Sequence, residues 1–257
     1  HIAASDEFAF DAQAYYLANG YDLPVGGTNA FLYSPPVLLA LRFIASVVPW
    51  PIFLELYTLA IGVGAWVLAG PVTPFVILTP QVASEITLGN IHIFLALVAV
   101  AGFRWPALWS FALLTKVTPG LIGVLWFVFR AEWRAVAWIL GVTAVIAVPT
   151  MVVAPDLWVA WIQRLVASSG SSDASLAVPL VVRLPVAIAI TFIGARRDQR
   201  WVVPLAALVA LPVIWDVHSL SMLLGVVWFA RRDLGPWIRR IRPGTPPSQP
   251  VPMGTGS

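Results

Sequence analysis

The chain has 257 residues, of which 60% are hydrophobic and 11% are charged, and its mean hydropathy is +0.87. A soluble domain carries about 25% charged residues, so this composition excludes an ordinary soluble globular protein. The absence of cysteine excludes disulfide bonds and cysteine metal sites. We read the formal net charge of +3 as topology signals and contacts to anionic lipid, not as a nucleic-acid footprint.

The apolar residues form continuous runs that approach or exceed the roughly 20 residues needed to cross a bilayer. We therefore predict an all-α fold, a polytopic transmembrane helical bundle with about nine spans in this chain. The spans are expected at residues 36–50, 53–70, 74–88, 90–103, 107–129, 135–154, 179–195, 201–214 and 217–230.

Three segments lie around this bundle, which is assigned to residues 35–232. Residues 1–34 are expected to form an outer, extracytoplasmic loop, and a first transmembrane helix is expected to be missing before His1. Residues 156–178 are predicted to form a second outer loop, with an amphipathic helix that carries Trp158, Trp161, Ile162 and Leu165. Residues 233–257 are rich in Pro, Gly, Ser and Thr and predict a disordered cytoplasmic tail.

The positions of the basic residues predict which loops lie on which side of the membrane. Arginine clusters follow three of the spans, at Arg130/Arg134, Arg196/Arg197/Arg200 and Arg231/Arg232/Arg239/Arg240/Arg242. Because basic loops stay in the cytoplasm, Asp11, Arg183 and His218 are all expected at the outer face of a multi-pass plasma-membrane protein. Prolines interrupt several spans, which predicts a compact bundle with a cavity, since broken helices need protein or water to satisfy their backbone.

Asp11 and His218 are candidates for proton transfer. A helix over Asp11-Ala-Gln-Ala-Tyr15 would place Asp11 and Tyr15 on one face, and a carboxylate at the lip of an apolar cavity can act as a general base. His218 follows Trp215-Asp216-Val217 at a break between two short spans. Each residue also has an ordinary interpretation, as a helix-start aspartate and as an interfacial histidine bonded to backbone.

Two cations lie within predicted spans. Arg183 is close to the outer end of its span, where it can snorkel outward or bind a lipid phosphate with its forked donors. Lys116 is the only lysine and lies in mid-span. It either takes part in the protein's activity or forms a purely structural ion pair with Glu85 or Glu55.

The stretch Gly89-Asn90-Ile91-His92 is expected near the inner side of the membrane. We interpret His92, beside Glu85, as a satisfied core histidine rather than a ligand. No metal site and no glycine-rich nucleotide loop are predicted.

These polar stretches resemble the motifs of the family 87 glycosyltransferases, and within that family the mannosyltransferase of phosphatidylinositol mannoside synthesis. The resemblance covers most of residues 6–232. The chain departs from the family motifs at Asn90, His92, Asp173-Ala174 and Val217, where the family has Gln, Asn, Asn-Gln and His. The matching stretches are Asp11-x-x-x-Tyr15-Tyr16 with Tyr33-Ser34-Pro35-Pro36, Gly89-Asn90-Ile91-His92, Lys116-Val117-Thr118-Pro119 with Arg130, Trp133 and Arg134 following, and Asp173-Ala174-Ser175-Leu176 with Arg183 and then Trp215-Asp216-Val217-His218.

The resemblance implies a GT-C-like enzyme that moves a sugar, typically mannose, from a polyprenyl-phosphate donor to a hydroxyl of a glycolipid or glycan. It implies neither a nucleotide nor a metal cofactor. Asp11 would deprotonate the acceptor. Arg183, with His218 and Lys116, would stabilise the departing phosphate. Substrate contacts would come from Tyr15, Tyr33 and Trp215.

Two alternatives remain at this point. A transporter or flippase for a lipid-linked or small polar substrate would also bury ionisable residues and break its helices, but it should show two related halves, which we do not find. A non-catalytic membrane scaffold would leave Asp11, Arg183 and His218 without a common purpose.

Overall fold

The computed structural model describes residues 9–22, 31–168, 178–214 and 218–241, and those residues contain helices and no strand. The all-α prediction is therefore confirmed. The α-helices are α1 (Phe10–Leu17), α2 (Pro35–Val47), α3 (Trp50–Ala69), α4 (Thr73–Ile77), α5 (Pro80–Leu88), α6 (His92–Ala101), α7 (Trp109–Thr115), α8 (Val117–Phe129), α9 (Trp133–Val153), α10 (Pro155–Ser168), α11 (Leu180–Arg196), α12 (Val202–Val209) and α13 (Leu224–Ile241). Short 3-10 helices are η2 (Gly70–Val72), η3 (Pro106–Leu108) and η4 (His218–Leu223).

Proline marks the beginning of several helices. It occupies the first or second position of α2, α3 and α5, where its missing N–H would have no partner in the helix. Local sequence therefore fixes where these helices start, although their packing depends on distant residues.

Only a few helices of the described residues can cross a bilayer by length and composition. They are the stretch Trp50–Ile77 and helix α9, with the bent pair α5–α6 as a third if it counts as one span. The chain is thus a helical membrane protein, but the nine expected spans are not shown, because several of them correspond to short or interrupted helices. The break between α7 and α8, for example, falls at Lys116, whose backbone is extended.

Helix α9 exposes a continuous apolar surface. Trp138, Val145 and Val152 are each at least 65% exposed, and no charge lies on the helix beyond Arg134. Such a continuous apolar surface is typical of a membrane contact rather than of a soluble monomer.

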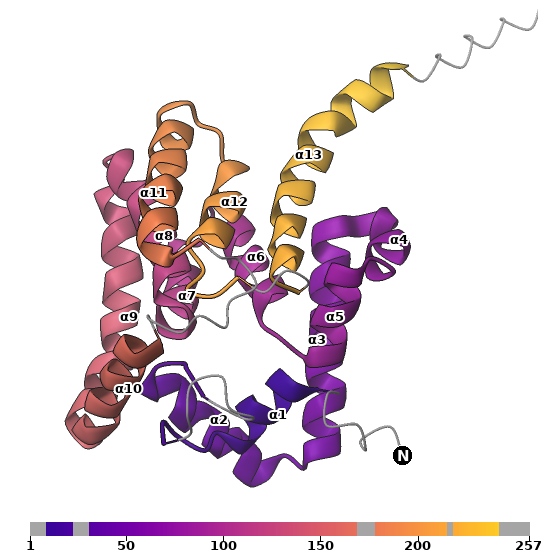
Figure 1. Cartoon of the computed structure of the whole chain (residues 1–257). Coiled ribbons are helices and arrows are strands. Elements are labelled where there is room, and N and C mark those ends of the chain that lie inside the picture. The colour runs from indigo at the N-terminus through magenta and orange to yellow at the C-terminus, as the bar shows by residue number, and fades with distance from the viewer. Residues whose placement is uncertain (1–8, 23–30, 169–177, 215–217, 242–257) are drawn as a thin grey trace, which may run out of the picture.

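Two of the arginine clusters lie at one end of the bundle. The Arg130 guanidinium donates to the carbonyl of Ala195 at 3.1 Å and lies 3.0 Å from a carboxylate oxygen of Asp198. The connection between α11 and α12 lies at this end, whereas α1, α2 and α10 lie at the opposite end (Figure 1). The fold therefore separates these arginines from Asp11, as the charge pattern predicts.

Helix α1 is fixed to the bundle by its contact with the end of α5. The amide of Ala9 donates to the carbonyl of Thr87 at 2.7 Å. Gly89 has φ of 70°, and a Cβ there would lie 2.6 Å from the Cβ of Ala12. Only glycine allows both this backbone conformation and this approach, so Gly89 sets the position of the residue beside Ala12, which is Asp11.

The segments around the bundle differ partly from expectation. The amphipathic helix predicted within residues 156–178 is present as α10, although residues 169–177 lie outside the described residues. Residues 10–17 of the expected outer loop are helical, with Ala12, Ala14 and Tyr15 buried. The last span was expected to end near residue 230, but α13 continues to Ile241, into the segment expected as a disordered tail.

Replacing Gly89 with alanine should destabilise the protein by about 2–4 kcal/mol, since it combines a left-handed backbone with an overpacked contact. Thermal unfolding of the purified full-length protein in detergent measures this loss. Gly141→Ala on α9 is the matched control, because its Cβ would meet nothing within 4 Å. Equal melting temperatures for Gly89→Ala and the wild type would contradict the role given to this contact.

Candidate active site

Asp11 is held by Asn90, which is 79 residues away in sequence. The Nδ2 group of Asn90 donates to Oδ2 of Asp11 at 2.6 Å. The Oδ1 atom of the same amide accepts from the backbone N–H of Ile91 at 2.7 Å. Because the acceptor end of the amide is already engaged, its donor end faces Asp11, and the carboxylate is held in one orientation.

The surroundings of Asp11 raise its pKa to about 6. Partial burial is the largest cause, because it disfavours the charged carboxylate. The hydrogen bond from Asn90 and the positive charge of Lys116 oppose this shift, and the negative charge of Glu85 adds to it. A carboxylate with this pKa is ionised at neutral pH and still basic enough to accept a proton from a substrate hydroxyl.

The bend between α5 and α6 gathers a second set of polar groups. The two helices meet at 109°, and Glu85 is fully buried within the bend. One oxygen of Glu85 accepts from the backbone of Ile93 at 3.1 Å, and the other lies 3.2 Å from Nδ1 of His92. The ring of His92 in turn lies 5.4 Å from that of His218 in η4, which packs against both α5 and α6. His92 is thus a buried core residue, but its Nε2 atom has no hydrogen-bond partner among the described residues, so the expectation of a satisfied core histidine is met only in part.

Lys116 lies at the break between α7 and α8. Its positive charge acts on both Asp11 and Glu85, although Lys116 forms no ion pair with either carboxylate in the described residues. The first turn of α8 is tied to the end of α12, because the hydroxyl of Thr118 donates to the carbonyl of Ala210 at 2.5 Å. This bond connects the Lys116 break to the chain that leads toward His218.

Tyr15 and Tyr33 are brought together on the α1 side of the site. Their hydroxyls are 2.7 Å apart, and both side chains are buried. Tyr57 of α3 completes the group, with its ring 5.9 Å from that of Tyr15 and its hydroxyl donating to the carbonyl of Asn90 at 3.4 Å. The predicted helical spacing of Asp11 and Tyr15 is confirmed, so one face of α1 carries both the carboxylate and this aromatic wall.

Arg183 bonds to backbone carbonyls. Its Nε donates to Val178 at 2.8 Å, and its two terminal nitrogens donate to Val209, Leu211 and Pro212 at 2.7, 2.8 and 3.0 Å. Three of these bonds hold the end of α12 and the chain just after it, which continues toward residues 215–218. The structure thus shows Arg183 as a clamp on backbone, and its expected role at a phosphate stays a prediction.

Asn90 is the functional candidate that sequence reasoning placed wrongly. It was expected near the inner side, opposite Asp11, because α5 and α6 were read as two separate spans. Their bend brings residues 89–92 to Asp11 instead. Trp215, Asp216 and Val217 lie outside the described residues, as does Asp173-Ala174-Ser175-Leu176.

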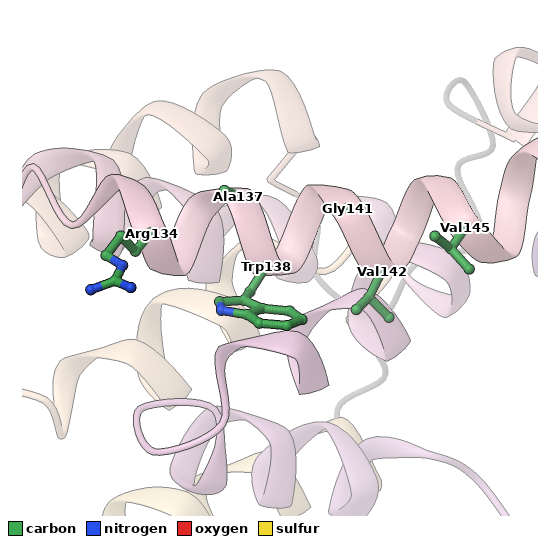
Figure 2. A pocket seen from close by; sticks show the side chains of 6 residues that line it. All are labelled: Arg134, Ala137, Trp138, Gly141, Val142 and Val145. Atoms are coloured by element: carbon green, nitrogen blue, oxygen red, sulfur yellow. The ribbon is translucent and has the colours of Figure 1, made fainter.

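A shallow groove of about 510 Å³ lies elsewhere, along the surface of α9 (Figure 2). Its lining residues are Arg134, Ala137, Trp138, Gly141, Val142 and Val145. None of them is a proton acceptor or belongs to the Asp11 cluster, and α9 is a membrane-spanning candidate with an outward apolar surface. The groove therefore suits contact with lipid, and the Asp11 cluster is the better candidate for chemistry.

Comparison with known proteins supplies one family. The comparisons with curated proteins and with solved structures gave no match. The model of glycosyltransferase family 87 matches residues 30–241, a segment that contains Tyr33, Asn90, Lys116, Arg183 and His218 and begins after Asp11. Because this match extends over most of the chain, the protein belongs to glycosyltransferase family 87.

Proposed function

We propose that this membrane glycosyltransferase moves mannose from a polyprenyl-phosphate donor to a hydroxyl of a glycolipid or glycan at the outer face of the plasma membrane. The resemblance of the sequence motifs to those of the mannosyltransferase of phosphatidylinositol mannoside synthesis motivates this choice. The observation that carries it is the oriented Asp11 carboxylate, whose pKa of about 6 suits a general base. Family membership disfavours the transporter alternative.

In this proposal, the acceptor hydroxyl attacks the anomeric carbon of the donor sugar while Asp11 takes the hydroxyl proton. The bond between that carbon and the phosphate oxygen breaks, and the polyprenyl phosphate leaves with the electron pair. The step uses neither a nucleotide nor a metal. Asn90 acts as a positioning residue, because it fixes the carboxylate that receives the proton.

Negative charge grows on the departing phosphate, and cations near Asp11 would stabilise it. Lys116 and His218 are the residues we assign to this task, because both lie in the same polar cluster. Arg183 contributes through the backbone that it clamps, which positions the chain before His218. Tyr15 and Tyr33, with Trp215, would form the substrate contacts.

Asp11→Asn in the full-length protein should lower sugar transfer by about 10²–10⁴, the range for loss of a general base. The assay follows labelled mannose from polyprenyl-phosphate-mannose into lipid in membranes that carry each variant. Asp22→Asn, an exposed aspartate beyond α1, is the matched control and should retain activity. Full activity of Asp11→Asn would refute the proposed base.

The fold of this variant can be checked independently. Because the pKa of Asp11 is raised, its contribution to stability is complete only when it is protonated and is lost as pH rises through about 6. Asparagine cannot ionise, so Asp11→Asn should be at least as stable as the wild type at pH 8. A lower melting temperature would mean that lost activity reflects lost folding.

The pH dependence tests the role of Asn90. The kcat/KM of the wild type should rise with pH around a midpoint of about 6, as Asp11 loses its proton. Asn90→Ala removes a hydrogen bond that lowers the pKa of Asp11, so its midpoint should move to higher pH. Thr87→Ala, an exposed change on α5, should leave the midpoint in place. An unchanged midpoint in Asn90→Ala would contradict the assignment.

A further inference from the structure

Two arginines are buried among the described residues, and their surroundings differ. Arg183 is 6% exposed, and its N–H groups donate to four backbone carbonyl oxygens. Arg164 in α10 is 7% exposed, yet its Nε and Nη2 atoms have no hydrogen-bond partner in the part of the chain that the structure describes. A buried charge without partners is costly, so Arg164 needs an explanation that packing does not give.

Arg164 lies on the inward face of α10. Trp161, one turn earlier, is buried, and its indole N–H donates to the carbonyl of Leu32 at 3.1 Å. Residues three apart on a helix are neighbours on one face, so Arg164 shares this face with Trp161. Val159 and Val166 are more than half exposed and occupy the opposite face.

This face of α10 is connected to the candidate active site by a short series of contacts. Leu32, which accepts from Trp161, precedes Tyr33, and the hydroxyl of Tyr33 bonds to that of Tyr15 at 2.7 Å. Tyr15 in turn lies one helical turn from Asp11 on α1. Arg164 therefore lies on the same end of the bundle as the candidate base, as the positions of α1, α2 and α10 also show (Figure 1).

The free atoms of Arg164 define the kind of ligand that would suit it. Nε and one terminal nitrogen together offer parallel N–H groups, which pair with two oxygens of a phosphate or carboxylate. The opposite face of α10 suits contact with lipid, since Val159, Ile162 and Val166 are exposed and apolar there, and this helix therefore places Arg164 close to the lipid surface. A phosphate carried on a lipid meets both conditions.

We propose that Arg164 is a binding residue for the phosphate of a lipid at the entrance to the Asp11 site. Its identification as the donor phosphate rests on the proposed function. In this arrangement the oxygens of the lipid phosphate accept hydrogen bonds from the unpartnered nitrogens of Arg164. Arg183 continues to bind backbone carbonyls.

The test measures binding without sugar transfer. The full-length protein is placed in phosphatidylcholine nanodiscs, and the probes are a short-chain prenyl phosphate, the matching prenyl alcohol and a short-chain phosphatidylglycerol. Arg164→Met should weaken binding of the prenyl phosphate by about tenfold or more, as loss of charge-assisted hydrogen bonds requires, and leave the alcohol unchanged. Arg197→Met, which removes an exposed arginine at the far end of α11, should bind every probe as the wild type does.

The probes separate the two sources of a lipid phosphate. Loss of affinity for the prenyl phosphate alone assigns Arg164 to the donor, and equal loss for phosphatidylglycerol assigns it to membrane headgroups. Unchanged affinity for both overturns the site. A wild type that binds the prenyl phosphate but transfers no sugar would refute the proposed function and leave this site standing.

Melting without ligand distinguishes a binding arginine from a structural one. Removing an unpartnered buried charge should leave the melting temperature of Arg164→Met unchanged or higher. Arg183→Met should lower it by about 5 °C or more, since four carbonyls lose their donor. A comparable drop for Arg164→Met would show a structural role and overturn the proposal.

Discussion

The contact between α1 and the bend of α5–α6 is the constraint on which the site depends. Gly89 lets Ala12 approach its backbone, and this approach brings Asp11 to the side chain of Asn90. The same bend buries Glu85 and holds His92 against it. A short helix of eight residues thereby acquires a fixed carboxylate, although its own length would not keep it folded in isolation.

Charge balance then gives the cluster its chemistry. Two carboxylates, one lysine and two histidines share a region from which water is largely excluded, so each charge acts strongly on the others. Desolvation raises the pKa of Asp11 to about 6, and the hydrogen bond from Asn90 and the charge of Lys116 limit this rise, so the carboxylate is ionised near neutral pH. The two buried arginines have different roles. Arg183 holds backbone, and Arg164 keeps two donors available for a ligand.

Sequence patterns predicted those parts of the structure that depend on neighbouring residues. The apolar runs gave the helical class, the i, i+4 spacing put Asp11 and Tyr15 on one face, and the amphipathic pattern located α10. The predicted position of Asn90 on the opposite side of the membrane from Asp11 was wrong, because the angle between α5 and α6 depends on which residues pack into the bend. The carbonyl partners of Arg183 could not be foreseen either, since three of them belong to a segment 26 or more residues away. Arg164 could have been noticed, since it is a charge on the face of α10 that carries Trp161.

The central claim is that Asp11 takes the proton of the acceptor hydroxyl and does not bind the donor. Azide is a nucleophile that carries no proton to remove, so it separates these two roles. Incubating the Asp11→Asn variant with labelled polyprenyl-phosphate-mannose and azide should yield mannosyl azide at the rate of the wild type, although transfer to hydroxyl acceptors is lost. Failure of the variant to form mannosyl azide, while the wild type forms it, would contradict the account and move Asp11 to the donor side of the reaction.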